Sequence, residues 1–256
     1  MHEPTRLLAA HAHRHIPLEG ARNVRDLGGL RTAEGGITRH GLLFRADTLA
    51  HLTDADQTRL AGLGLATIID LRTEPERLKA PDRVPGNPAP EIQALGFLPR
   101  GNLEMFAAIN AGELGADEAL EAMLGQYRAL TLEHHDRYLA FGQTLLHPAR
   151  RPLLFHCASG KDRTGIAAAI VLLALEVPPA TVLEDYVISN FQRRPVDAFT
   201  AGAAGPAVEQ VMAADPRYLE AAFAAMIEAS GSIPAYLAEL GLDAEARRHL
   251  RALMVE

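Results

Sequence analysis

The sequence predicts an α/β fold, with a mostly parallel central sheet flanked by helices and with extra helices toward the C-terminus. Three observations favour this fold. Short apolar runs alternate along the chain with segments of helical periodicity, as in repeated strand–helix units. The runs are apolar at successive positions, which is typical of parallel strands buried on both faces. The last quarter of the chain is helical in pattern, and we expect it to pack on one side of a single domain covering residues 1–256.

The first half of the chain contains three predicted strands. A polar, turn-rich start leads us to expect a loose N-terminal segment over residues 1–20. Strands are predicted at 42–45, 66–71 and 91–97, with a proline-rich loop at 81–90 before the last of them. Thr53 is suited to cap a helix at 54–62, because its hydroxyl can accept a hydrogen bond from a first-turn N–H.

The second half is mainly helical. The periodicity over 102–147 is interrupted at Gly112 and Gly115, and its weak first part motivates the hypothesis of a mobile helical lid at 102–130. Firmer helices are predicted at 117–130 and 134–147. Further helices are predicted at 180–191, 196–213, 216–229 and 233–253, the last broken at Gly241.

Composition narrows the class of protein. With 48% hydrophobic residues in 256, the chain can bury a globular core and is not intrinsically disordered. Its net charge of −7 argues against nucleic-acid binding through phosphate contacts. No apolar run approaches the roughly 18 residues of a membrane helix, and the N-terminus has no long apolar leader, so we expect a cytoplasmic protein without integral membrane association. The single cysteine excludes a disulfide framework and a multi-cysteine metal site.

The segment HCASGKDRTG, residues 156–165, carries the clearest chemical signal. It lies between a predicted buried strand at 152–157 and a strongly apolar helix at 163–176. Ligands of α/β sheets bind at such carboxyl ends of strands, where loop amides and the positive end of the helix attract anions. Arg163 adds a planar fork that matches two phosphate oxygens. A cysteine in this position, Cys157, is expected to ionise and to attack phosphorus.

Other interpretations of the segment fit less well. A lone cysteine after an apolar strand is usually a small buried hydrophobe, but by composition the surrounding His156, Gly160 and Arg163 would occur by chance only about 3 times in 10,000. A Walker-type loop would need glycine at Phe155 and serine or threonine at Asp162. A Cys–His protease would not need the Gly-Lys-Asp-Arg sequence. No histidine grouping predicts a structured metal site.

The loop resembles the signature of the protein tyrosine phosphatase superfamily, Cys-x5-Arg followed by Thr. With NVRDLGG at 23–29, the fuller HCxxGKDRTG motif is similar to the bacterial branch of tyrosine and lipid phosphatases. The segments GLLFRAD, IIDLRTEPE and EDYVISN also match that branch. The resemblance therefore extends from about residue 20 to 191 and implies a tyrosine phosphatase-like fold.

The resemblance implies a role for each loop residue. Cys157 is the expected nucleophile, forming a phosphocysteine that water hydrolyses. Thr164 would donate its hydroxyl to the sulfur, although it is also an ordinary first-turn helix residue, and His156 would orient the loop. Phosphate would be held by the Arg163 guanidinium and by backbone amides of the loop, which runs through Ala158, Ser159, Gly160, Lys161, Asp162 and Arg163.

Two aspartates are candidates for the general acid that protonates the leaving oxygen. The chain has no tryptophan, so it cannot hold a Trp-Pro-Asp acid loop. We favour Asp162, because its place in the loop puts it beside the phosphate. Asp70, at the end of the 66–71 strand, is the alternative. It could instead support the structure by pairing with Arg72 or Arg163.

The implied activity is that of a metal-independent phosphatase without a cofactor. It would act on phosphotyrosine, with phosphoserine, phosphothreonine and phosphoinositides as further candidates, and release inorganic phosphate. A small-molecule phosphatase, acting on inositol phosphates or nucleotides, and an inactive phosphate-binding module are the alternatives.

Several charged residues have two interpretations at this stage. In the bacterial branch that this chain resembles, enzymes with a lysine at the position of Lys161 accept highly charged substrates such as phosphoinositides. The alternative is an exposed lysine that only aids solubility. Arg45 could support the site or pair with Asp47, and Asp26 could support the site or pair with Arg25. The charges at 74–77 fit a solvated helix face.

Overall fold

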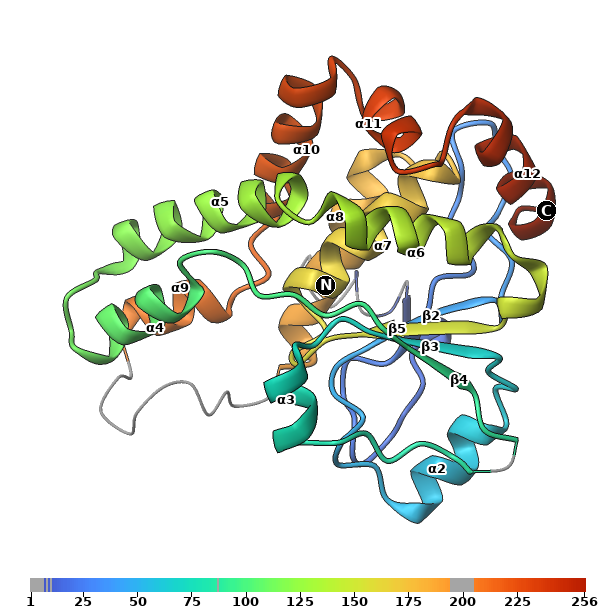
Figure 1. Cartoon of the computed structure of the whole chain (residues 1–256), viewed down its shortest axis with the longest axis horizontal. Helices are drawn as coiled ribbons and strands as arrows, with labels where there is room; N and C mark the ends of the chain where they lie inside the picture. Colours follow the sequence, from blue (N-terminus) through green and yellow to red (C-terminus); the bar gives the residue numbers. More distant parts are fainter. Residues whose placement is uncertain (1–6, 8, 10, 87, 194–204) are drawn as a thin grey trace.

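A five-stranded sheet lies at the centre of the computed structural model, which describes residues 7, 9, 11–86, 88–193 and 205–256 (Figure 1). The strand order is β1-β2-β5-β3-β4, and β1 alone of these runs antiparallel to its neighbour. The strands are β1 (Arg25–Asp26), β2 (Leu43–Ala46), β3 (Thr67–Asp70), β4 (Glu91–Ala94) and β5 (Leu153–His156). The predicted α/β fold with a mostly parallel sheet is confirmed.

Strands β2, β3 and β5 are buried on both faces because their apolar side chains alternate between two core clusters, whereas β4 at the edge of the sheet is mostly exposed. Ile69 and Phe155 belong to the larger cluster, whereas Ile68 and Leu154, the preceding residues of the same strands, belong to the smaller one. Adjacent side chains of a strand point to opposite faces. A run that is apolar at every position is therefore what a sheet covered on both sides requires.

Helices cover the two faces unequally (Figure 1). The short helices α2 and α3 lie on one side of the sheet, and α6 and α7 lie on the other with the C-terminal helices beyond them. The bounds are α2 (Asp54–Ala61), α3 (Glu74–Lys79), α4 (Asn102–Asn110), α5 (Ala116–Leu132), α6 (His135–Leu146), α7 (Asp162–Ala174), α8 (Pro179–Val187), α9 (Pro206–Met212), α10 (Pro216–Ser230), α11 (Ile233–Glu239) and α12 (Ala244–Met254).

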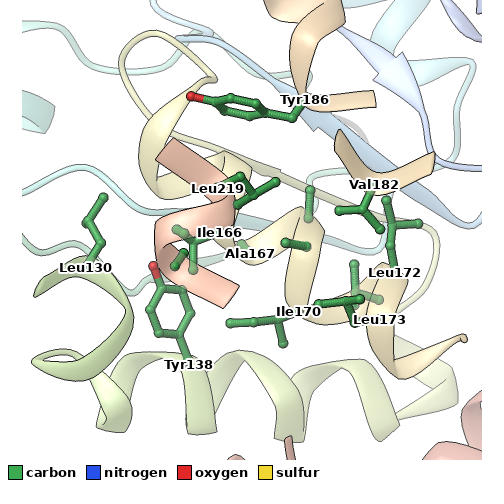
Figure 2. Packing of buried hydrophobic residues seen from close by; sticks show 14 of the residues in the cluster. Leu130, Tyr138, Ile166, Ala167, Ile170, Leu172, Leu173, Val182, Tyr186 and Leu219 are labelled. Carbon is green, nitrogen blue, oxygen red and sulfur yellow. The ribbon is translucent and has the colours of Figure 1, made fainter. Parts of the chain in front are cut away.

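Helix α7 is the central helix of the larger core. Every residue of α7 after Asp162 is buried, which explains why its sequence is apolar all round rather than amphipathic. Figure 2 shows Ile166 and Ile170 of α7 among side chains from neighbouring helices, including Leu130 of α5 and Tyr138 of α6. The helix that begins at the Cys157 loop is thereby fixed on all sides.

The N-terminal segment differs from the expectation of a loose chain where the structure describes it. Residues 1–6, 8 and 10 lie outside the described residues, but Arg14 is only 1% exposed and donates to the carbonyl of Asp26. His15 forms a β-bridge with Arg25. Within 11–20 only Arg14 and Gly20 are buried, and the Arg14 side chain reaches a buried carboxylate, Asp185, at 2.9 Å.

Several element boundaries also differ from the predicted ones. Strand β4 ends at Ala94 rather than at residue 97, and α8 ends at Val187, with a 3-10 turn over Ile188–Phe191. The predicted helix at 196–213 falls partly on residues outside those described, and α9 forms its visible end. The break at Gly241 separates α11 from α12 as expected.

Within the described ranges, no single helix has the length and apolar character needed to cross a membrane. Helices α10 and α11 taken together have the length and composition of such a helix, but the chain bends by 75° between them.

Candidate active site

The Cys157 loop lies where three parallel strands end. Ala46 of β2 and Asp70 of β3 both pair in register with His156 of β5. The residues that follow these strands, Asp47, Leu71 and Cys157, therefore reach the same edge of the sheet, and α7 begins at Asp162 on the far side of the loop. This is the position at which open α/β sheets bind ligands.

The carbonyl groups of the loop accept hydrogen bonds from neighbouring parts of the chain. Thr48 N donates to the carbonyl of Ala158 at 3.1 Å. The Asn23 side chain donates to the carbonyls of Ser159 and Gly160, at 3.3 and 3.0 Å, and Arg45 donates to that of Gly160 at 2.8 Å. Within the described part of the chain, the amide groups of residues 158–161 donate no hydrogen bond. The loop therefore forms an anion-binding nest with its N–H groups available.

Gly160 is required by the shape of this loop. Its φ is +65°, in the left-handed region that favours glycine. A Cβ atom at this position would lie 2.5 Å from the carbonyl oxygen of Ala46. A side chain would therefore push the loop away from the end of β2.

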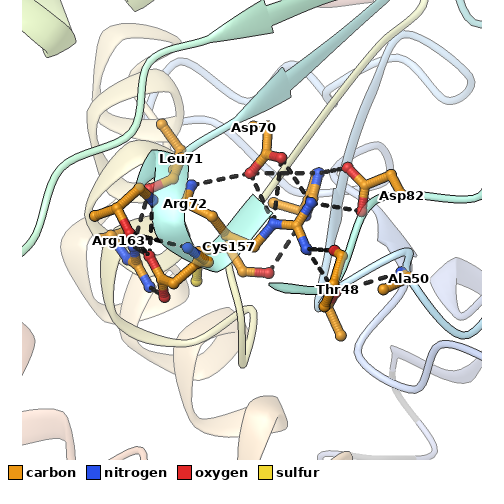
Figure 3. Close-up of polar contacts among 12 residues, drawn as sticks. Thr48, Ala50, Asp70, Leu71, Arg72, Asp82, Cys157 and Arg163 are labelled. Carbon is orange, nitrogen blue, oxygen red and sulfur yellow. Dashed lines mark hydrogen bonds and ion pairs between the residues drawn. The ribbon is translucent and has the colours of Figure 1, made fainter. Parts of the chain in front are cut away.

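Arg163 is held from behind by Glu76 of α3. Its Nη1 and Nη2 atoms donate to Oε2 and Oε1 of Glu76, both at 2.7 Å, and Nη1 also donates to the carbonyls of Leu71 and Phe97. Burial alone would lower the pKa of Arg163, but these hydrogen bonds and the negative charges nearby outweigh it and raise the pKa. Figure 3 shows Arg163 beside Leu71 and Cys157. The guanidinium is fixed as a permanent cation beside the thiol.

The two candidate acids occupy different environments. Asp162 lines the cavity over the loop, and its side chain is 28% exposed. Asp70 is 2% exposed, and its carboxylate accepts hydrogen bonds from Arg72 Nε at 2.9 Å and Nη2 at 2.7 Å. Figure 3 shows Asp70 facing Arg72. The pairing with Arg72, one of the interpretations considered for Asp70, is therefore the one observed.

His156 belongs to a buried polar cluster beneath the loop. Its Nε2 atom lies 3.1 Å from Asp82 and 3.8 Å from Asp70, and its Nδ1 atom lies 3.3 Å from the carbonyl oxygen of Cys157. Arg72 also pairs with Asp82, at 2.8 Å. The side-chain ligand atoms of His156, Asp70 and Asp82 lie within 4.8 Å of one another, as in a metal site. The Arg72 guanidinium, however, already supplies a positive charge to both carboxylates.

Lys161 is buried, unlike a solubilising surface lysine. Its Nζ atom donates to the carbonyls of Val211 and Ala213, at 2.5 and 3.0 Å, and lies 3.3 Å from Oδ1 of Asp162. Burial lowers the pKa of Lys161, against the effect of Asp162. The lysine thus connects the loop to the end of α9.

Arg45 contacts the loop and does not pair with Asp47. With Arg14 and Arg25 it surrounds Asp185 of α8, at 2.7, 2.9 and 3.0 Å. Burial alone would raise the pKa of Asp185, but the three arginines hold it well below its usual range. Burial and the neighbouring Arg45 lower the pKa of Arg25 to about 9. This cluster supports the loop through the Arg45 bond to Gly160.

Asp26 does not reach the loop and does not pair with Arg25. Its carboxylate accepts from the amides of Gly28 and Gly41, both at 2.8 Å, and lies 3.1 Å from His40. Asp26 therefore stabilises the segment of residues 27–41 and makes no contact with the Cys157 loop.

A cavity of about 350 Å³ opens above the loop. Its polar lining includes Ser159, Asp162, Arg163 and Glu76. Its apolar lining is made by Leu98, Pro99, Phe106, Val211 and Met212. Cys157 itself is 1% exposed, and Ala158 and Ser159, which follow it, line the cavity.

Sequence reasoning missed three residues of the site. Glu76 lies in the 74–77 segment interpreted as a solvated face, although it also ends the matched segment IIDLRTEPE and completes the Thr-x-x-Glu pattern of the capping box that begins α3. Asp185 lies in a matched segment, but nothing in the pattern links it to three arginines. Tyr127 of α5, which donates to Asp162 at 2.8 Å, left no signal in the sequence.

Comparison with known proteins agrees with this geometry. The model of the tyrosine phosphatase family matches residues 16–256. A putative tyrosine-protein phosphatase of Cupriavidus necator is 31% identical over 252 residues, covering 90% of this chain and 86% of its own. The triple specificity protein phosphatase PtpB of Mycobacterium tuberculosis is 29% identical, over 93% of this chain and 98% of its own length. A tyrosine-protein phosphatase of Nostoc commune is 28% identical, over 81% of this chain and 72% of its own length. This chain belongs to the tyrosine phosphatase family, whose members act on phosphorylated substrates, and it is a phosphatase.

Proposed function

We propose that this phosphatase hydrolyses phosphotyrosine monoesters through a phosphocysteine intermediate on Cys157. The observation that carries the proposal is the outward turn of the loop carbonyls toward Thr48, Asn23 and Arg45. The N–H groups of residues 158–161, which directly follow the only cysteine of the chain, donate no hydrogen bond to any described residue. Amides arranged in this way, with Arg163, bind the equatorial oxygens of a phosphoryl group during transfer.

The reaction has two steps. The Cys157 thiolate attacks phosphorus, so that an S–P bond forms while the bond from phosphorus to the leaving oxygen breaks, and Asp162 donates a proton to that oxygen. A water molecule then attacks phosphorus and gives a proton to the Asp162 carboxylate. The S–P bond breaks, releasing inorganic phosphate and restoring the thiolate.

Two neighbours support the thiolate in this proposal. The hydroxyl of Thr164 is buried and has no hydrogen-bond partner among the described residues, so it can donate to the sulfur. His156, held by Asp82, orients the start of the loop through the carbonyl of Cys157.

The shape of the cavity favours phosphotyrosine among the candidate substrates. The apolar lining, which includes Leu98, Phe106 and Met212, suits an aromatic ring above the phosphate. The engagement of Lys161 by two carbonyls weakens the case for phosphoinositides, since its ammonium is not directed to further phosphates. Phosphoserine and phosphothreonine are shorter and bury less of this wall.

We also propose a cytoplasmic location. The mechanism needs a reduced thiol, and cytosolic thiols are kept reduced.

The test is phosphate release, with EDTA present, from matched phosphotyrosine and phosphoserine peptides and from a dispersed phosphoinositide. We expect the fastest release from the phosphotyrosine peptide and none from Cys157→Ser, which should still bind phosphate. Undiminished release by Cys157→Ser would overturn the mechanism. Soluble inositol phosphates and nucleotides are tested in the same assay. Phosphate binding without release from any substrate would make the chain a binding module, and release only from these small molecules would make it a small-molecule phosphatase.

A further inference from the structure

The carboxylate of Asp162 is held by a tyrosine from another part of the fold. The hydroxyl of Tyr127, on α5, donates to Oδ1 of Asp162 at 2.8 Å. The hydroxyl of Tyr186, on α8, lies 2.6 Å from that of Tyr127. Both tyrosines are buried. Helices α5, α7 and α8 therefore meet at this one carboxylate.

The direction of this hydrogen-bond chain follows from the number of protons. A phenol carries one O–H. Because Tyr127 uses its proton toward Asp162, it must accept the proton of Tyr186. Burial, and then the charge of Asp162, raise the pKa of both Tyr127 and Tyr186 well above 10. Both hydroxyls therefore keep their protons over the whole range in which the enzyme would work.

The chain makes the two oxygens of Asp162 unequal. Oδ1 accepts from Tyr127 and lies 3.3 Å from the ammonium of Lys161. Oδ2 makes no hydrogen bond with any described residue, and Asp162 lines the cavity. Oδ2 is thus the oxygen available to carry a proton toward a bound phosphate ester.

We infer that Tyr127 is a positioning residue for the general acid, and that Tyr186 holds Tyr127 in place. Tyr127 fixes Oδ1 and thereby presents Oδ2 to the leaving oxygen. This inference rests on the proposed function and on Asp162 as the acid. Among the described residues, Lys161 and Arg163 of the same loop and the hydroxyl of Tyr218 on α10 also interact electrostatically with Asp162. Since Tyr127 belongs to α5, the acid is oriented only while α5 is packed against the loop.

A series of aryl phosphates separates positioning of the acid from a general loss of structure. A strongly acidic phenol leaves without being protonated, whereas a weakly acidic one needs the general acid. We expect Tyr127→Phe to lower kcat/KM for phenyl phosphate roughly tenfold and for dinitrophenyl phosphate less than about twofold. Tyr186→Phe should shift the series in the same direction by a smaller factor.

Tyr236→Phe is the matched control. Tyr236 is also buried, and its hydroxyl donates to the carbonyl of Thr131 near the end of α5, at 2.7 Å. The variant therefore removes one hydrogen bond that holds α5 without touching Asp162. Its kcat/KM should be unchanged across the whole series.

The outcomes distinguish the inference from the function on which it rests. A loss in Tyr127→Phe that is equal for all phenols would make Tyr127 a structural residue and overturn the inference, while Cys157-dependent release by the wild-type chain would leave the proposed function standing. A wild-type chain that releases no phosphate would overturn both. If Tyr127→Phe does not fold, Tyr186→Phe decides, because it keeps the Tyr127 hydroxyl. No leaving-group dependence in that variant overturns the inference.

Discussion

Glu76 and Arg163 form a bidentate ion pair, in which the two terminal nitrogens of the guanidinium each lie 2.7 Å from a different carboxylate oxygen. The pair joins α3 to the first turn of α7. It leaves the remaining donors of Arg163 near the cavity, in a fixed plane. Paired N–H···O bonds of this kind are geometrically specific as well as strong.

Replacement of Glu76 should therefore loosen Arg163. We expect Glu76→Gln to lower kcat/KM for a phosphotyrosine peptide by roughly ten- to a hundredfold, because a misplaced guanidinium stabilises the transferring phosphoryl group less well. Steady-state kinetics on a phosphotyrosine peptide check this.

Two variants of α3 serve as controls for Glu76. Thr73→Ala removes the cap of α3, as Glu76→Gln partly does, together with the hydroxyl that donates to Oε2 of Glu76 at 2.9 Å, but it keeps the carboxylate that pairs with Arg163. Glu74→Gln changes an exposed charge on the same helix. An equal loss of activity in Thr73→Ala would show that capping, rather than the ion pair, is responsible.

Arg163 itself should not tolerate lysine. An ammonium cannot reproduce the planar fork that meets Glu76 on one side and phosphate on the other. We expect Arg163→Lys to lose activity by a factor on the order of 10² to 10³, with weaker inhibition by inorganic phosphate. Near-normal kcat/KM would contradict the assigned role.

The pH profile separates the two candidate acids. The rate should rise as the Cys157 thiolate forms and fall as the general acid loses its proton. In Asp162→Asn the falling limb should disappear. In Asp70→Asn it should persist, although the chain should be less stable because Arg72 loses one of its two carboxylate partners and keeps only Asp82. A falling limb that disappears only in Asp70→Asn would make Asp70 the acid.

The elements that form the floor of the site could be predicted because their signals are local. The apolar runs at 66–71 and 152–157 correspond to β3 and β5, and the apolar stretch from residue 163 corresponds to α7. Burial on both faces gives such segments a composition that does not depend on which neighbours cover them. The loop between β5 and α7 was located for the same reason.

The contacts across the site could not be predicted because they join residues far apart in sequence. Glu76 shares its charge pattern with solvated helices, and only the packing of α3 against the loop gives it Arg163 as a partner. Lys161 could contact a charged substrate or be an exposed lysine on sequence grounds, but the end of α9 supplies carbonyls that a pattern cannot reveal. Asp70 had two possible arginine partners, and the strand end placed it against Arg72.

The hypothesis of a mobile lid at residues 102–130 remains a prediction, and α4 is the part of it that favours opening, because α5 buries Met123, Tyr127 and Leu130 among other residues. Helix α4 buries only Met105 and Ile109 and begins at Gly101 without a side-chain cap, whereas α7 is buried along nearly its whole length. Few buried contacts favour local opening. We expect amide hydrogens of α4 to exchange much faster than those of α7, and phosphate or vanadate to slow that exchange. Exchange in α4 as slow as in α7 would rule out a mobile lid.

Asp185 makes the stability of the fold depend on acid. Its pKa is well below 3.8 in the folded chain, so its contribution is fully present above the unfolded value and is lost as the pH falls through the folded one. We expect Asp185→Asn to destabilise the chain by about 3–5 kcal/mol at pH 7, since three buried arginines lose their carboxylate. Below pH 4 the wild-type free energy of unfolding should fall more steeply than that of the variant. Urea unfolding between pH 7 and pH 2 measures both effects, with Asp54→Asn as the control because its side chain is 92% exposed. If the two proteins lose stability in parallel on acidification, the carboxylate of Asp185 is not the group that holds the three arginines together.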